Sequence, residues 1–109
     1  MTFPDDAVME SLRALAEAEA LVIEDGALEA AVPDPTTPDG VRFHPIAPDH
    51  LDALEERGWV SLFDGRDGLE VTHKGDYALD RWLRSRGNKG RAPRVAAVRR
   101  RMFGRRLSR

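Results

Sequence analysis

The stretch that decides the fold is PDHLDALEERGWVSLFDGRDGLEVTHKGDYALDRWL, residues 48–83 of a chain of 109 residues. Its first part, residues 48–58, predicts a short helix, because proline suits the first helical position and glycine suits the position just after the end. Leu51 and Leu54 would form the buried edge of this helix.

Two strands and a final helix are expected next. Residues 59–63 and 69–73 have the composition of strands, and they flank DGRDG at 64–68, which is typical of a tight turn. Thr72 is well placed to cap a last helix over residues 73–86. The order helix, strand, turn, strand, helix follows from these local signals.

The large apolar side chains of this stretch are expected to form the core. Trp59 begins the first strand, and the apolar set of the last helix is Tyr77, Leu79, Trp82 and Leu83. The two tryptophans could instead stack on nucleic-acid bases. We favour core packing, because a small domain depends on its largest side chains for buried area.

Toward the N-terminus, residues 5–24 predict a helix. Acidic residues suit its start, near the positive end of the helix dipole, and Met9, Leu12, Ala16, Ala20 and Ile23 recur at spacings of three and four. The rival interpretation is a hairpin, LVIE-DG-ALEA over residues 21–30, because Asp-Gly between apolar runs is a hairpin signal. The alanine and glutamate content favours the helix.

A proline-rich segment separates this region from residue 48. Five prolines lie within residues 33–48, a density that no helix tolerates. We expect an irregular loop there, in which VRF at 41–43 could be extended.

Charge is distributed very unevenly along the chain. Residues 1–83 contain 19 acidic and 6 basic residues, a net charge of −13, whereas residues 84–109 contain 11 basic residues and no acid. This asymmetry predicts a domain over residues 1–86 and a basic C-terminal extension over residues 87–109.

The basic extension is the strongest functional signal in the sequence. Residues 87–93 (GNKGRAP) are typical of a flexible joint, and beyond it we expect a disordered or partly helical tail. An amphipathic helix there would carry Val95, Val98, Met102 and Phe103 on one side. Arginine and lysine neutralise phosphates, so a dense basic segment is typical of nucleic-acid binding. The expected contacts are Arg66 in the turn and Arg91, Arg94, Arg99, Arg100, Arg101, Arg105 and Arg106 in the extension.

Other roles stay open for these cations. The extension could dock on the acidic body or on another protein, lie on an anionic membrane, or have no specific partner. Arg66 could simply belong to an ordinary tight turn, in which aspartate and glycine serve the backbone geometry.

Residues 50–83 resemble the second half of the winged helix-turn-helix domain found in MarR-like and PadR-like bacterial regulators. The likeness rests on a helix that ends in Gly58 and an aromatic residue, a two-stranded wing, and the step Val71-Thr72-His73-Lys74-Gly75 into another helix. It implies an α+β winged-helix fold, in which the helix before the wing enters the major groove and the wing tip meets the backbone. It also implies a homodimer, since related regulators are often dimers.

The sequence departs from that pattern in two places. A complete helix-turn-helix has another helix just before residue 48, and only residues 26–32 could supply a short one. The helix before the wing is also acidic, since Asp49, Asp52, Glu55 and Glu56 outnumber His50 and Arg57. Phosphates repel such a surface.

Several function classes find no support in the sequence. The absence of cysteine excludes disulfides and thiolate zinc sites, and His44, His50 and His73 match no metal-ligand signature. No hydrolase, phosphate-loop or metalloprotease motif occurs. The N-terminal residues lack the pattern of a secretory signal, and no apolar run approaches the ~20 residues that cross a bilayer.

The function that these patterns predict is a non-enzymatic DNA-binding protein, a small cytoplasmic transcriptional regulator without a cofactor or a membrane partner. Its basic extension would contact the phosphates of duplex DNA. The alternative is a winged-helix interaction module that does not bind DNA, in which the acidic helix over residues 48–58 meets a basic protein surface.

Overall fold

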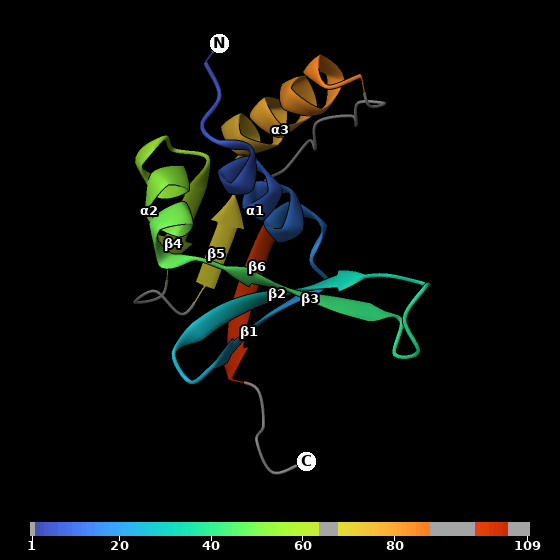
Figure 1. Ribbon diagram of the computed structural model, residues 1–109. Helices are drawn as coiled ribbons and strands as arrows, with labels where there is room; N and C mark the ends of the chain where they lie inside the picture. The colour runs from blue at the N-terminus through green and yellow to red at the C-terminus, as the bar shows by residue number, and fades with distance from the viewer. Residues whose placement is uncertain (1, 64–67, 88–97, 105–109) are drawn as a thin grey trace.

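The structure of the protein, a computed structural model, describes residues 2–63 and 68–87 and, as backbone only, residues 98–104. Three helices and six strands lie within these residues, so the fold is α+β (Figure 1). Their order along the chain is α1 (Asp6–Glu17), β1 (Ala20–Glu24), β2 (Ala27–Pro33), β3 (Val41–Ile46), α2 (Pro48–Glu56), β4 (Val60–Phe63), β5 (Gly68–Val71), α3 (His73–Ser85) and β6 (Val98–Gly104).

The six strands form one sheet in the order β3-β2-β1-β6-β5-β4. Neighbouring strands are antiparallel, except that β6 runs parallel to β1. Figure 1 shows the three helices grouped together, with β6 in red beside β5. The last described strand therefore joins the N-terminal three-stranded unit to the hairpin of β4 and β5.

The expectation of an amphipathic helix beyond residue 94 is wrong, because Val98–Gly104 is a strand. Val98 and Phe103, which would share one side of a helix, pair with residues of two different strands, Val71 of β5 and Val22 of β1. Without β6, the facing edges of β1 and β5 would have unpaired backbone groups. Backbone pairing with both strands outweighs the helical spacing of the apolar residues in this segment. The division into a domain of residues 1–86 and an extension of residues 87–109 stays a prediction.

The expectation of a continuous helix over residues 5–24 is also wrong, and the rival hairpin is correct. Helix α1 ends at Glu17, and β1 and β2 pair around Asp25 and Gly26. Both residues of this turn have positive φ, 54° and 78°. A two-residue turn of this kind matches the twist of the strands it joins, which is why Asp-Gly is favoured there.

The proline-rich segment contains a strand as well as a loop. Asp34 begins the loop, and its carboxylate accepts hydrogen bonds from the N–H and the hydroxyl of Thr36 at 2.9 and 2.6 Å. Strand β3 then pairs with β2 over its whole length of six residues. Only three of these, residues 41–43, were expected to be extended. Pro45 is tolerated because β3 lies at the edge of the sheet and has one partner among the described strands.

The helix predicted over residues 48–58 is confirmed as α2, with Pro48 in its first turn. Gly58 ends it with φ +76°. The N–H groups of Gly58 and Trp59 donate to the carbonyls of Glu55 and Leu54, both at 3.0 Å. This is the hydrogen-bond pattern of the Schellman motif, which glycine permits at low cost.

The hairpin and the last helix are confirmed as well. Strands β4 and β5 pair antiparallel, and the turn between them, residues 64–67, lies outside the described residues. Thr72 caps α3, since its hydroxyl oxygen accepts a hydrogen bond from the N–H of Gly75 at 3.0 Å. The same hydroxyl donates to the Gly58 carbonyl at 2.7 Å, so the cap connects α3 to the end of α2.

The core lies between the helices and the sheet. Trp59 and Trp82 are each 3% exposed, which confirms the expectation of core packing. Tyr77 is 48% exposed, so its expected place in the core is wrong. The largest fully buried apolar side chains come from α1, β1, α2, β5 and α3 and include Met9, Leu12, Leu15, Leu21, Leu54, Leu69 and Leu79.

The order of elements is not that of a winged helix-turn-helix domain. In the described residues, the place of the helix before residue 48 is taken by three strands, and the residues 26–32 expected to supply that helix fall almost wholly in β2. Residues 48–85 do keep the order helix, two strands, helix that the resemblance was based on.

Truncation of a core tryptophan tests this packing. Trp82→Ala should lower the free energy of unfolding by roughly 3–5 kcal/mol, because a buried ring leaves a cavity that the surroundings fill only partly. Urea unfolding followed by Trp59 fluorescence measures the loss. Tyr77→Ala, on the same helix but exposed, is the control, and equal losses in the two variants would contradict this core.

A second variant tests the contact between α3 and the end of α2. A Cβ at Gly75 would overlap the carbonyl oxygen of Trp59. Gly75→Ala should therefore destabilise the protein by roughly 1–3 kcal/mol, although alanine is the better helix former by ~1 kcal/mol. Thermal unfolding measures the change, with Lys74→Ala as the exposed neighbour for comparison. A stabilised Gly75→Ala variant would show that the close approach is absent.

Candidate nucleic-acid interface

The outer side of α3 carries a row of cations around one aromatic ring. Lys74, Tyr77, Arg81 and Arg84 are all exposed, and they follow one another at spacings of three and four residues. Residues at this spacing share one side of a helix. We call these four residues the α3 basic face.

The two acidic residues of α3 point away from solvent. Asp76 and Asp80 are 3% and 7% exposed, respectively. Nε of Arg84 lies 3.1 Å from Oδ2 of Asp80, so one guanidinium of the basic face pairs with a buried carboxylate. The exposed charges of α3 are consequently all positive.

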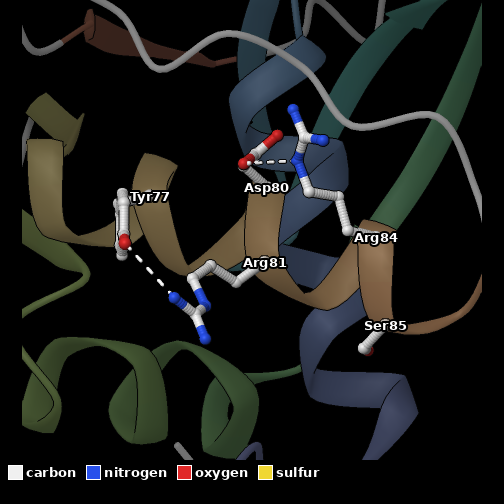
Figure 2. A pocket seen from close by; sticks show the side chains of 5 residues that line it. All are labelled: Tyr77, Asp80, Arg81, Arg84 and Ser85. Carbon is white, nitrogen blue, oxygen red and sulfur yellow. Dashed lines mark hydrogen bonds and ion pairs between the residues drawn. The ribbon is translucent and has the colours of Figure 1, made fainter.

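Tyr77 and Arg81 hold each other in position. The guanidinium carbon of Arg81 lies 5.8 Å from the centre of the Tyr77 ring, and Nη1 donates to the tyrosine hydroxyl at 3.3 Å. Figure 2 shows both side chains projecting from α3, together with the pair of Asp80 and Arg84. This contact combines a cation with an aromatic face, which stabilises both groups.

These side chains line a hollow of about 600 Å³. Its described lining is Tyr77, Asp80, Arg81, Arg84 and Ser85 (Figure 2). Guanidinium groups bind phosphate oxygens with paired hydrogen bonds, and an exposed aromatic ring stacks on bases. The arrangement is therefore suited to bind a phosphate-containing chain that also carries planar rings.

Helix α2 has the opposite character. Asp49, Asp52 and Glu56 are exposed on it, and its cation at the end, Arg57, lies over the Trp59 ring at 5.1 Å and donates to the Thr2 carbonyl at 3.3 Å. An acidic surface repels phosphates. The helix that a winged-helix protein would insert into the major groove therefore has the wrong charge for that role.

The structure brings part of the expected arginine cluster into the sheet. Arg99, Arg100 and Arg101 lie in β6, where their Cα partners on β5 are Glu70, Leu69 and Gly68. The backbone of this triplet is thereby fixed beside an acidic strand residue and a buried leucine. The other expected contacts lie outside the described residues, namely Arg66, Arg91, Arg94, Arg105 and Arg106.

The three histidines lie in three different elements, β3, α2 and α3. His50 shares a hydrogen bond with the hydroxyl of Ser11 at 2.9 Å, which links α2 to α1, and His73 is exposed at the start of α3. His44 lies on β3 and lines a groove with Glu10 and Arg13 of α1. Within the described residues, no group of three potential metal ligands comes together.

The residues of the α3 basic face were not among the expected contacts. The sequence predicts a core position for Tyr77, includes Arg84 only in the basic segment of residues 84–109, and indicates no role for Lys74 or Arg81. The signal was present in KGDYALDRWLR, residues 74–84, where basic and aromatic residues recur at helical spacing while the acids fall between them. Charge counted over whole segments conceals such a pattern.

In comparisons with family models, with curated proteins and with solved structures, nothing matches the chain. The resemblance to winged-helix regulators therefore stays a prediction from the sequence. No helix in the described part of the chain is long and apolar enough to cross a membrane.

The environment of His44 predicts a pH dependence of stability. Burial lowers the pKa of its imidazole below 6.5, Arg42 and His50 act in the same direction, and Glu10 opposes them. The folded protein then binds fewer protons at this site than the unfolded chain, so stability falls as the pH drops through about 6.5. Wild type should lose more stability than His44→Gln between about pH 7.5 and 5.5, measured by urea unfolding. Identical pH profiles of wild type and His44→Gln would contradict the assignment.

Proposed function

We propose that the protein is a non-enzymatic nucleic-acid-binding protein that contacts the phosphate backbone through the α3 basic face. The observation that carries the proposal is the sorting of charge on α3, with cations outside and both acids buried. Residues 1–83 have a net charge of −13, so a surface with positive charges only differs from the rest of this acidic part of the chain. Clustered lysine and arginine on one side of a helix are the electrostatic footprint of nucleic-acid binding.

Two of these cations are available to a ligand. Within the described residues, Lys74 and Arg81 form no ion pair with a carboxylate, whereas Arg13 and Arg42 pair with Glu17 and Asp34 at 3.2 and 3.6 Å. An exposed cation without a carboxylate partner gains most from a phosphate, since no existing pair has to be broken. Lys74 and Arg81 therefore have the leading role in the proposal.

The basic segment after α3 supports the same function. Arg91, Arg94, Arg105 and Arg106 would add sequence-independent phosphate contacts, which raise affinity without reading bases. The favoured setting is regulation of transcription in the cytoplasm, with two copies on duplex DNA. This proposal uses the helix after the wing, and it gives the acidic α2 no contact with DNA.

A second candidate rests on α2. Its exposed acids, Asp49, Asp52 and Glu56, fit a basic protein surface, and in that case the protein is an interaction module that does not bind DNA. The two functions use different helices. Variants of α3 affect the first function and leave the second unchanged.

A salt titration of binding to a duplex of ~20 base pairs tests the proposal. The slope of log K against log salt is about −0.9 per phosphate neutralised, so Lys74→Ala/Arg81→Ala should weaken binding and reduce the slope by about 1.8. Arg13→Ala/Arg42→Ala removes the same charge elsewhere and is the matched control. These point variants are preferable to deletion of residues 87–109, because deletion would remove β6 from the sheet.

Two results would count against the proposal. Equal effects of the two double variants would mean that net charge, and not the α3 basic face, determines binding. No binding by wild type at ~50 mM salt, where phosphate contacts are strong, would exclude nucleic acid and leave the interaction module as the function to test.

A further inference from the structure

We infer that the α3 basic face binds an unpaired strand as well as duplex phosphates, with one base of the unpaired strand stacked on Tyr77. The inference rests on the proposed function and adds which form of nucleic acid the face recognises. It follows from the juxtaposition of an exposed aromatic ring with guanidinium groups around one hollow.

Tyr77 is exposed although the helix around it is firmly packed. It occupies α3 beside Ala78 and Leu79, which are fully buried, yet 48% of its own surface is accessible. Truncating it would cost the core little, so its contribution to packing does not account for a large ring at this position. Aromatic rings in nucleic-acid-binding proteins commonly serve as stacking platforms, because every base has a π-face.

The ring is also held in place before any ligand binds. The guanidinium of Arg81 lies over the ring and donates a hydrogen bond to its hydroxyl. A side chain that is already ordered loses less conformational entropy on binding than a mobile one. Tyr77 and Arg81 thus form a small preorganised surface.

The hollow beside the ring provides room and polar groups. Its volume of about 600 Å³ lies within the range of sites for small organic ligands. Arg81 and Arg84 can bind a phosphate at its border, where Arg84 also pairs with Asp80 at 3.1 Å. The hydroxyl of Ser85 donates to the Trp82 carbonyl at 2.7 Å. Lys74 and Arg84 are ten residues apart, which separates them by ~15 Å along the helix and leaves space for more than one phosphate.

Base stacking discriminates between the two forms of nucleic acid. In a duplex both faces of each base are covered by neighbouring pairs, so Tyr77 could contact the backbone or base edges but could not stack on a base. An unpaired strand offers a free base face, and such a contact typically changes affinity by roughly tenfold or more. The phosphate contacts alone are common to both forms.

The test separates stacking from charge with two labelled probes of equal length, a 12-nucleotide oligothymidylate and a 12-unit abasic oligonucleotide. Fluorescence anisotropy at ~50 mM salt gives the affinity of the full chain for each probe. Wild type should bind oligothymidylate more tightly than the abasic probe by roughly tenfold. Tyr77→Leu should abolish this difference between the two probes, whereas Tyr77→Phe, which keeps the ring, should retain it. Lys74→Ala should weaken binding of both probes alike.

Each outcome bears on the inference in a defined way. Equal affinity of wild type for the two probes, or a Tyr77→Leu variant that keeps the preference for oligothymidylate, would overturn it. If the Lys74→Ala/Arg81→Ala variant still loses duplex binding in that case, the proposed function stands without the stacking contact. Circular dichroism and thermal unfolding check that the exposed Tyr77 substitutions leave the fold intact, and a failure of wild type to bind any probe would overturn both proposals.

Discussion

The arrangement of the second half of the molecule depends on one close approach, that of the first turn of α3 to the backbone of Gly58 and Trp59. Thr72 makes the connection, because its N–H donates to the Trp59 carbonyl while its hydroxyl donates to the Gly58 carbonyl and accepts from the N–H of Gly75. Gly75 allows the approach, since a Cβ there would meet the Trp59 carbonyl. These groups lie at the end of α2, in the segment after β5 and in the first turn of α3. They also fix the rotation of α3 about its axis, and this rotation places the α3 basic face outside and Asp76 and Asp80 inside.

A second constraint comes from β6, which makes the acidic body and part of the basic segment into one sheet. The charge asymmetry of the sequence indicates two separate regions, yet Arg99 lies opposite Glu70 in the register of β5 and β6. Backbone pairing therefore limits which arginines can act as an independent tail. This favours the cations of α3 over the Arg99–Arg101 triplet as ligand contacts, because a rigid helix presents them. Sites on rigid elements hold their geometry better than sites on loops.

Local signals were sufficient for about half of the fold. Pro48, Gly58 and Thr72 mark the ends of α2 and α3 through backbone chemistry that needs no distant partner, and these elements were predicted within a few residues. β6 was not expected, β1 and β2 were expected only in the rival hairpin, and β3 was expected only over residues 41–43. The pairing partners of these strands lie far away in the chain, or the strands compete with a helical spacing of apolar residues. Asp25-Gly26 was the exception, since turn chemistry indicated the hairpin before the partner was known. The candidate site was missed because Tyr77 recurs with the apolar residues at helical spacing, a pattern that indicates a core position. Only the packed structure shows that its ring faces solvent.

The position of β6 also determines when the protein can fold during its synthesis. Both strands that flank β6 come earlier in the chain, β1 by about eighty residues. Until residue 104 has left the ribosome, the N-terminal three-stranded unit and the β4–β5 hairpin each have an edge with unpaired backbone groups. Such edges are prone to pair with other chains, and contacts of large sequence separation form slowly. Folding of the complete sheet therefore has to wait until β6 is available, and until then a nascent chain would depend on chaperones or on low local concentration to protect these edges.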